Sequence, residues 1–191
     1  MTAVLLSGGI DSLVCAELAR QAGKLTACVF VDYGHPAQIA EGWRAFAYAG
    51  TRGVPLLAPH VRDLQLGAMS TADGPAIVPH RNAILLAVAA NAATAHGATS
   101  LTIGVSGADQ AVYQDCRPAF IDAMASALGM PILTPLVDMQ KTAVVRRAAQ
   151  LGLTRDDAWP CYRGGPSPCG QCASCLESAR AWRVLEQDLA G

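Results

Sequence analysis

Four of the seven cysteines gather near the end of the chain, in the run CYRGGPSPCGQCASC. They are Cys161, Cys169, Cys172 and Cys175, and thiolate sulfur is a strong ligand for soft metal ions. Four cysteines are typical of a closed, tetrahedral zinc site with a structural purpose. Three closely spaced cysteines also suit a [4Fe–4S] cluster, and a disulfide pair is the third alternative. The spacing predicts a metal site in residues 161–175, with zinc as the expected ion.

A second chemically distinctive segment is SGGIDS, residues 7–12, which follows the apolar residues 4–6. A strand that ends here and a helix that starts near Ser12 leave several backbone N–H groups without helical partners. Glycines let the backbone approach a ligand closely, and the hydroxyls of Ser7 and Ser12 add donors. The alternative is a tight strand-to-helix turn with a serine cap. The segment predicts a nest for phosphate or pyrophosphate, in which Asp11 holds a magnesium ion or a backbone N–H.

Two basic residues stand where a helix is expected to begin. Arg81 opens a long apolar segment, and Lys141, one of only two lysines, follows the residues TPL at positions 134–136. Arg81, at the start of a helix, is placed to reach a phosphate, and the family resemblance described below suggests the same role for Lys141. The alternative for both is an ordinary solvated residue at a helix end.

Apolar runs typical of strands alternate with longer segments typical of helices. The expected strands are residues 4–6, 26–32, 55–61 and 100–105. The expected helices are residues 12–22, 37–52 and 81–96, and they end at glycines such as Gly23, Gly53 and Gly97. This alternation predicts an α/β fold: a Rossmann-like, doubly wound parallel sheet in residues 1–158. Residues 159–191 are expected to form a small C-terminal zinc-binding knuckle and a final helix.

Composition limits the partners of this 191-residue chain, which is 52% hydrophobic and has a net charge of −1. No apolar run approaches the roughly 18 residues of a membrane span, and the N-terminus lacks the basic region of a secretory signal. The charge argues against a broad phosphate-binding face and so against nucleic-acid partners. We therefore expect a cytoplasmic protein that acts on a small molecule, away from membranes.

Four segments together resemble a known enzyme family. SGGIDS resembles the pyrophosphate loop of the N-type ATP pyrophosphatases, which adenylate a carboxylate, an amide or a tRNA base. The runs VPHRN at residues 78–82 and YQDCRP at 113–118, with the cysteine run at 161–175, resemble the 7-cyano-7-deazaguanine synthases. The likeness covers residues 3 to 176, and the combination is far more specific than any single segment.

That resemblance implies a two-stage reaction in one site. ATP would adenylate 7-carboxy-7-deazaguanine and release pyrophosphate, and ammonia would convert the acyl-adenylate to an amide. A second ATP would activate the amide oxygen, so that loss of water gives the nitrile, 7-cyano-7-deazaguanine, a queuosine precursor. A carboxylate is a poor electrophile, so a good leaving group must be attached before a neutral amine attacks. The cofactors implied are Zn²⁺ and Mg²⁺, with ATP as cosubstrate.

The resemblance also assigns roles to individual residues. Binding of ATP and pyrophosphate falls to Ser7, Gly8, Gly9, Asp11, Ser12, Asp32, Tyr33, Arg81 and Lys141. Catalysis falls to Asp11, Lys141 and Arg81. Asp115 and Arg117 are candidates for the deazaguanine pocket, because a carboxylate can accept from the amidine-like edge of the base.

Three departures from the family's pattern keep other functions open. Residues 65–78 are shorter than usual, His35-Pro36 stands where glutamine is commoner, and Ser178 stands where an arginine is usual. One alternative is a related ligase that activates a different carboxylate or joins a deazaguanine acid to an amine on another molecule. The other is a nucleotide-binding zinc module without catalysis. The family implies a homodimer, for which residues 182–185 offer an apolar face; a helix packed on its own domain is the alternative.

Overall fold

A computed structural model describes residues 1–64 and 78–190, so most of the shortened segment at 65–78 lies outside the described residues. Its centre is a five-stranded sheet in the order β3-β2-β1-β4-β5, and every neighbouring pair is parallel. The strands are β1 (Thr2–Leu5), β2 (Leu25–Val29), β3 (Leu56–Leu57), β4 (Ser100–Thr102) and β5 (Ile132–Leu133). The predicted parallel sheet is confirmed; β2, β3 and β4 are shorter than the apolar runs suggested, whereas β1 begins two residues earlier than expected.

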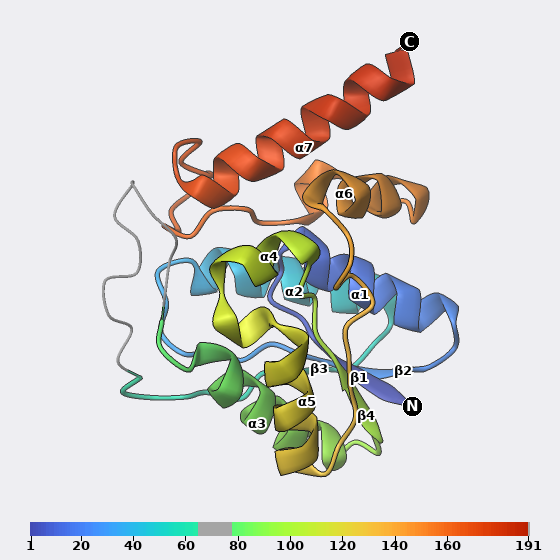
Figure 1. Cartoon of the computed structure of the whole chain (residues 1–191), viewed down its shortest axis with the longest axis vertical. Coiled ribbons are helices and arrows are strands. Elements are labelled where there is room, and N and C mark those ends of the chain that lie inside the picture. Colours follow the sequence, from blue (N-terminus) through green and yellow to red (C-terminus); the bar gives the residue numbers. More distant parts are fainter. Residues whose placement is uncertain (65–77, 191) are drawn as a thin grey trace.

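Seven α-helices surround this sheet in the described part of the chain (Figure 1). They are α1 (Ile10–Gln21), α2 (Gln38–Arg52), α3 (Arg81–Thr94), α4 (Gly107–Val112), α5 (Pro118–Leu128), α6 (Lys141–Gln150) and α7 (Ala173–Ala190). Short 3-10 helices cover Gln114–Cys116 and Arg155–Asp157. The predicted helix end at Gly53 is confirmed, because this glycine adopts the left-handed conformation at the C-cap of α2. None of the helices in residues 1–64 and 78–190 combines the length and hydropathy needed to cross a bilayer.

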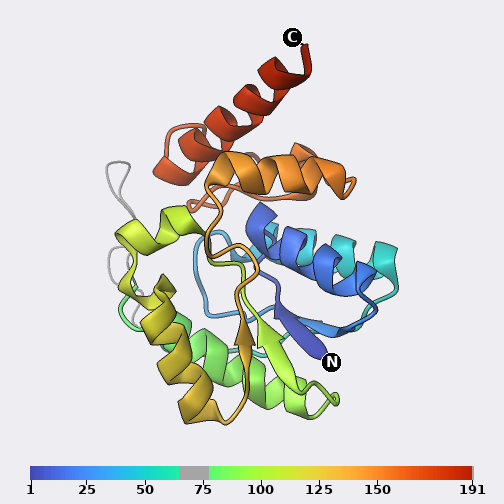
Figure 2. The same ribbon diagram turned by 45° about the vertical axis from the view of Figure 1, so that its right-hand side comes forward.

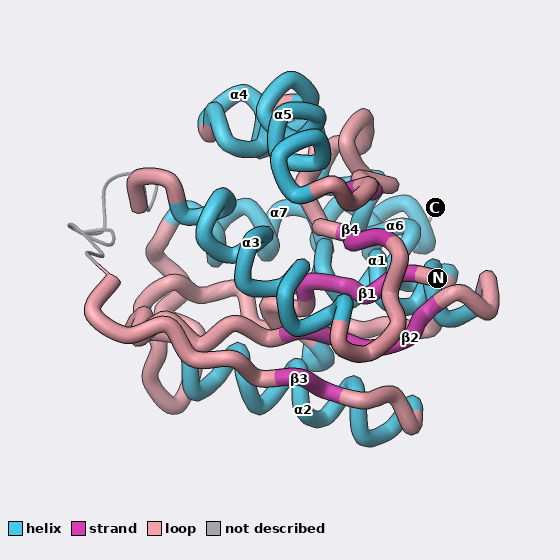
Figure 3. The backbone as a smooth tube through the Cα atoms, turned by 90° about the horizontal axis from the view of Figure 1, so that it is seen from below, coloured by secondary structure: helices cyan, strands magenta, loops and turns pink. Residues whose placement is uncertain are grey.

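Alternating side chains of the strands separate two hydrophobic cores. Val4 and Cys28 face a core built with α1, α2, α6 and α7, whereas Ala3, Leu5 and Val29 face a core built with α3 and α5. The period of two is that of a strand buried on both faces. Figures 2 and 3 show helices on both sides of the strands, as in a doubly wound fold. From β1 the chain moves outward to β2 and β3, and it then returns to the other side of β1 to form β4 and β5. Such folds bind ligands at this switch point, beside the carboxyl ends of β1 and β4.

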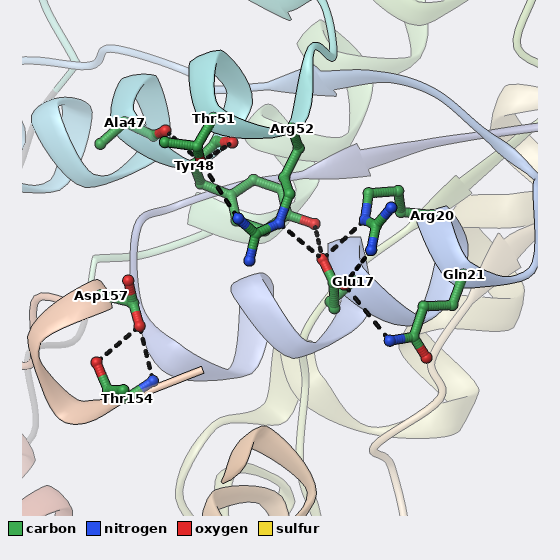
Figure 4. A network of polar contacts seen from close by, with 9 residues as sticks. All are labelled: Glu17, Arg20, Gln21, Ala47, Tyr48, Thr51, Arg52, Thr154 and Asp157. Carbon is green, nitrogen blue, oxygen red and sulfur yellow. Dashed lines mark hydrogen bonds and ion pairs between the residues drawn. The ribbon is translucent and has the colours of Figure 1, made fainter. Parts of the chain in front are cut away.

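A buried carboxylate ties α1 to α2. Glu17 is only 2% exposed and accepts hydrogen bonds from Arg20 Nη2 at 2.6 Å, Tyr48 Oη at 3.0 Å and Arg52 Nε at 3.4 Å (Figure 4). The Arg20 hydrogen bond, followed by that from Tyr48 and the charge of both arginines, holds the pKa of Glu17 below its usual value. The network fixes the packing of the helix that begins at the SGGIDS loop.

The final helix packs on the rest of the chain. Ala181, Trp182 and Leu185 are buried in the same core as α1 and α6, and Arg146 on α6 pairs with Asp188 at 2.5 Å. Residues 182–185 therefore do not offer the apolar face considered for a homodimer; the alternative, a helix packed on its own domain, is the one observed. The division of the chain at residue 158 stays a prediction.

Candidate functional site

The SGGIDS loop follows β1 at the carboxyl edge of the sheet. Gly8 has φ +83°, and a Cβ there would lie 2.4 Å from the Glu41 carbonyl oxygen, so the position requires glycine. The Ser7 hydroxyl accepts from the Gly9 N–H at 3.3 Å, and the Ser12 hydroxyl donates to the Gly9 carbonyl at 2.8 Å. No side chain caps α1, so the first-turn N–H groups are available to an anion.

Asp11 and Lys141 form an ion pair beside this loop. Lys141 Nζ lies 2.6 Å from Asp11 Oδ2, and both side chains are largely buried. Burial raises the pKa of Asp11, and the Lys141 ammonium opposes that shift. Burial acts to lower the pKa of Lys141, but Asp11 and Asp109 hold it above its usual value, so the amine is charged. The second oxygen, Asp11 Oδ1, is buried without a hydrogen-bond partner in the described part of the chain.

Asp11, Lys141 and residues of the SGGIDS loop line one cavity. Two further carboxylates line this cavity, and sequence reasoning missed both. Asp109 Oδ2 accepts from the backbone N–H and hydroxyl of Ser106 at 2.8 and 2.7 Å, which caps α4. Glu177, on α7, has its pKa raised by burial, while the charge of Lys141 lowers it. Neither lies in a recognisable motif; only the folded chain brings α4 and α7 to the loop.

Arg81 lines the same cavity, near several tyrosines. Burial acts to lower the pKa of Arg81, and Tyr33, Tyr162 and Asp115 raise it above its usual value. Tyr113 lies near Tyr162, which is in the cysteine-rich segment, and burial raises the pKa of both phenol groups. The three tyrosines and Arg81 all line the cavity. Tyr113 and Tyr162 stand in the runs YQDCRP and CYRGGPSPCGQCASC, but sequence reasoning assigned neither of them a role.

His35 occupies one of the positions that depart from the family's pattern. It is 3% exposed, its ring stacks on Tyr33 with centroids 4.3 Å apart, and its Nε2 lies 2.7 Å from Glu41 Oε2. Both His35 and Glu41 line the cavity, and His35 Nδ1 is a buried atom without a partner among the described residues. The departure therefore places a buried ionisable pair next to the predicted nucleotide site.

Four residues predicted for the nucleotide and substrate site lie outside the lining of this cavity: Gly8, Asp32, Asp115 and Arg117. Asp32 accepts from the Gly34 N–H at 3.1 Å and lies 3.0 Å from His60 Nδ1. Asp115 Oδ2 accepts from the Asn82 N–H at 3.2 Å, at the start of α3, and Arg117 donates to the Gln110 carbonyl. Cys116, between them, does line the cavity, where burial raises the pKa of its thiol to about 12. Contacts of Asp115 and Arg117 with substrate stay predictions.

The four predicted cysteines converge. Their sulfur atoms all lie within 4.8 Å of one another, with Cys169 and Cys175 4.0 Å apart. A tetrahedron with zinc–sulfur bonds of about 2.3 Å needs sulfur separations of about 3.8 Å, so the residues fit the metal. Backbone N–H groups of Gln171 and Cys172 donate to the Cys169 sulfur and lower the pKa of that thiol to about 6. None of the seven cysteines, all in the described residues, forms a disulfide.

Comparison with known proteins identifies relatives over nearly the whole chain. Residues 60–186 match the family described as "Queuosine biosynthesis protein QueC". The "7-cyano-7-deazaguanine synthase 1" of Mesorhizobium japonicum is 32% identical, over 98% of this chain and 89% of that protein. Both matches include the cysteine cluster and the helix that Arg81 begins.

Solved structures with low sequence identity share the fold. The NMN synthetase of Francisella tularensis superposes with a TM-score of 0.59 at 15% identity, covering 97% of this chain and 84% of that chain. The U34-tRNA thiolase NcsA of Methanococcus maripaludis, solved with its [4Fe-4S] cluster, has a TM-score of 0.56 at 17% identity and covers 98% and 65%. These likenesses show the fold alone, because the sequence identities are low. The family match and the synthase relative also show the family. Together with the loop and the converging cysteines, they show that this chain belongs to the QueC family of queuosine biosynthesis proteins.

Proposed function

We propose that the protein is an ATP-dependent carbon–nitrogen ligase that converts 7-carboxy-7-deazaguanine and ammonia to 7-cyano-7-deazaguanine. One observation carries the proposal beyond the family match. The SGGIDS loop, with its uncapped helix terminus and the Asp11–Lys141 pair, opens into the same cavity as Arg81 and three tyrosines. A phosphate site and an aromatic site therefore share one space, as a reaction between ATP and a heteroaromatic acid requires.

In the first stage the substrate carboxylate attacks the α-phosphorus of ATP, and the bond from that phosphorus to the pyrophosphate oxygen breaks. The N–H groups of residues 7–12 and the Lys141 ammonium receive the negative charge that develops on pyrophosphate. Ammonia then attacks the acyl carbon, AMP leaves, and the nitrogen loses a proton. In the second stage the amide oxygen attacks the α-phosphorus of a second ATP and displaces pyrophosphate. AMP then leaves with that oxygen as the nitrogen loses its remaining protons, which gives the nitrile. Arg81 is placed to bind the nucleotide phosphates or the substrate carboxylate.

Two metal ions accompany this proposal. Asp11 is the residue that would hold Mg²⁺, because its Oδ1 is buried and unpartnered beside the loop. Magnesium bound there supplies positive charge to the leaving pyrophosphate. Zinc is proposed for the cysteine cluster, since four thiolates close a tetrahedral site without an open position. Elemental analysis distinguishes the ions: about one zinc per chain supports this assignment, and iron with inorganic sulfide overturns it.

The reaction is tested by incubating the protein with 7-carboxy-7-deazaguanine, ATP, magnesium and ¹⁵N-labelled ammonium. Mass spectrometry should detect labelled amide first and labelled nitrile later. Turnover of another carboxylate, with none of this acid, would favour the related ligase that the buried His35–Glu41 pair leaves open. Absence of any ATP-dependent pyrophosphate release would favour a non-catalytic module. The near-neutral chain and the aromatic cavity support a free small-molecule substrate, and the clustered thiols suit the reducing cytoplasm.

A homodimer belongs to the same proposal, with its interface on α2. Ile39, Trp43 and Phe46 form an apolar stripe along the outer face of this helix and are 72%, 67% and 60% exposed. Large apolar side chains bury roughly 150–250 Å² each, so the stripe offers on the order of 400 Å². A two-fold contact doubles that to roughly 800 Å², half of a standard interface of about 1,600 Å². The net charge of −1 leaves little repulsion between two copies.

Light scattering after size-exclusion chromatography tests the α2 interface. Trp43→Glu should shift the protein from dimer to monomer, because it places a charge in the centre of the stripe. Leu189→Glu is the matched control, since Leu189 is 79% exposed near the end of α7. A monomeric unmodified protein, or a dimer that survives Trp43→Glu, would refute the interface.

A further inference from the structure

We propose that Tyr162, carried by the cysteine-rich segment, binds the planar heteroaromatic substrate and helps to set its specificity, together with Tyr113. This inference rests on the proposed function and adds a substrate-contacting residue that neither the sequence pattern nor the family match assigns. It also gives the metal site a part in shaping the cavity.

The lining of the cavity combines two kinds of chemistry. Ser7, Gly9, Asp11 and Lys141 are suited to phosphates. Arg81, Tyr113, Cys116 and Tyr162 line the same cavity and supply a cation and aromatic rings. With ATP phosphates at the loop, we expect the heteroaromatic acid to bind beside the tyrosines.

Tyr162 is the aromatic group best placed to receive a planar ring there. Tyr33 is buried and already stacks on His35, with ring planes 18° apart. In the described part of the chain no aromatic ring stacks on Tyr113 or Tyr162. Both rings line the cavity and lie near each other. Each nucleobase-like ring has a face that stacks on such side chains.

The cysteine-rich segment holds Tyr162 in position through several contacts. Tyr162 follows Cys161, whose sulfur accepts from the N–H groups of Arg163 and Cys169 at 3.4 Å each. The Trp159 N–H donates to the Gly8 carbonyl at 2.9 Å, which joins the segment to the pyrophosphate loop. Trp159 Nε1 also donates to the Cys161 carbonyl at 2.8 Å.

The cysteine-rich segment also contacts the loop that follows β2, at Pro36. Gly164 has φ +68°, and a Cβ there would lie 2.1 Å from the Pro36 carbonyl oxygen, so the backbones touch. Ala37, at the start of α2, is buried in one cluster with Trp159, Cys161, Cys172 and Cys175. The cysteine cluster therefore supports one wall of the cavity. Tyr162 belongs to this wall and lines the cavity.

The test is calorimetric binding of 7-carboxy-7-deazaguanine, without turnover, to the full-length zinc-loaded protein and two variants. Tyr162→Ala should weaken binding at least tenfold, within the factor of about 5 to 150 that loss of one base–aromatic stack costs. Tyr162→Phe keeps the ring and should bind within about threefold of the unmodified protein. Affinity for a non-hydrolysable ATP analogue and zinc content should be unchanged in both, which a purely structural role would not give.

Each outcome either supports or refutes the role of Tyr162 as a substrate contact. If Tyr162→Ala binds the acid as well as the unmodified protein, or loses affinity for acid and nucleotide equally, Tyr162 is not a substrate contact. If Tyr162→Ala loses zinc, Tyr162→Leu decides, because it keeps the bulk without the aromatic face and should still bind at least tenfold more weakly. If the unmodified protein binds the acid without turning it over, the proposed reaction fails while this inference is judged by binding alone. No binding at all overturns both.

Discussion

Helix α1 carries two poorly exposed carboxylates, one near each end, and they differ in how their oxygens are satisfied. Glu17 accepts from Arg20, Gln21, Tyr48 and Arg52, and its pKa is lowered, first by the Arg20 hydrogen bond. Asp11 has Lys141 as its side-chain partner, keeps one buried oxygen without a partner among residues 1–64 and 78–190, and has its pKa raised by burial.

The contrast separates a structural group from a functional one. A protein interior satisfies its polar groups, because an unpaired buried acceptor costs about 1–3 kcal/mol. Glu17 obeys that rule and joins two helices. Asp11 breaks it beside the pyrophosphate loop, where a ligand can supply the missing partner. The same helix therefore combines a rigid anchor with a site that is completed only on binding.

The largest effect is expected from Asp11→Asn, which removes the charge and keeps the shape. Loss of a group that acts on the developing charge costs about 100- to 1,000-fold in turnover. Stability in denaturant should change less than it does for the equivalent change at Glu17. Steady-state pyrophosphate release checks this prediction, and near-normal turnover in Asp11→Asn would reverse the assignment of the two carboxylates.

Glu17→Gln is the matched change at the other carboxylate. It removes the anion that two half-exposed arginines and the Tyr48 hydroxyl share, so the free energy of unfolding should fall by about 2 kcal/mol. Turnover measured on the folded protein should stay close to normal, because Glu17 does not line the cavity. Urea unfolding and activity at a temperature where the variant is folded provide the two readouts. A variant of normal stability with impaired turnover would contradict the structural role.

Lowering the pH tests the role of Glu17 further, because the pKa of this carboxylate lies below its usual value. The stability that this carboxylate contributes is fully present above its unfolded pKa of about 4.5 and is lost as the pH falls through the lower folded value. The unmodified protein should therefore lose stability more steeply below about pH 4.5 than Glu17→Gln does. Unfolding curves between pH 3 and pH 7 measure the two slopes; parallel slopes would show that Glu17 does not gain from its network.

The smallest effect is expected at an exposed ion pair. Arg146 and Asp188 lie 2.5 Å apart, but both are 48% exposed, so water and salt screen their interaction. Asp188→Asn should change stability by less than about 0.5 kcal/mol and leave turnover unchanged. This variant sets the baseline for Asp11 and Glu17. A loss as large as that of Glu17→Gln would mean that burial does not explain the difference.

Local patterns in the sequence predicted the parts of the site that lie close together along the chain. The run of residues 7–12 and the four cysteines were recognised from short-range spacing alone. In the structure the run follows β1, and the four sulfur atoms lie close together. The alternating apolar runs predicted the parallel sheet for the same reason. Helix α4 and strand β5 are too short for any period to emerge, so they were not expected.

Other residues that line the cavity come from segments far apart in the sequence, and only the fold brings them together. Asp109, Tyr162 and Glu177 reach it from three separate segments, and the sequence motifs assigned a role to none of them. Asp115 was expected in the cavity, but its carboxylate accepts from the Asn82 N–H at the start of α3. The side chain of Cys116, the next residue, faces the cavity instead. Residue type alone does not reveal which of two neighbours points inward.

The products of ATP turnover test the central claim most directly. With 7-carboxy-7-deazaguanine and ammonium present, the unmodified protein should release AMP and pyrophosphate, two of each for every nitrile formed. Asp11→Asn should release neither at an appreciable rate, while Glu17→Gln should match the unmodified protein. Formation of ADP and phosphate, or equal activity in all three proteins, would contradict both the adenylation chemistry and the role assigned to Asp11.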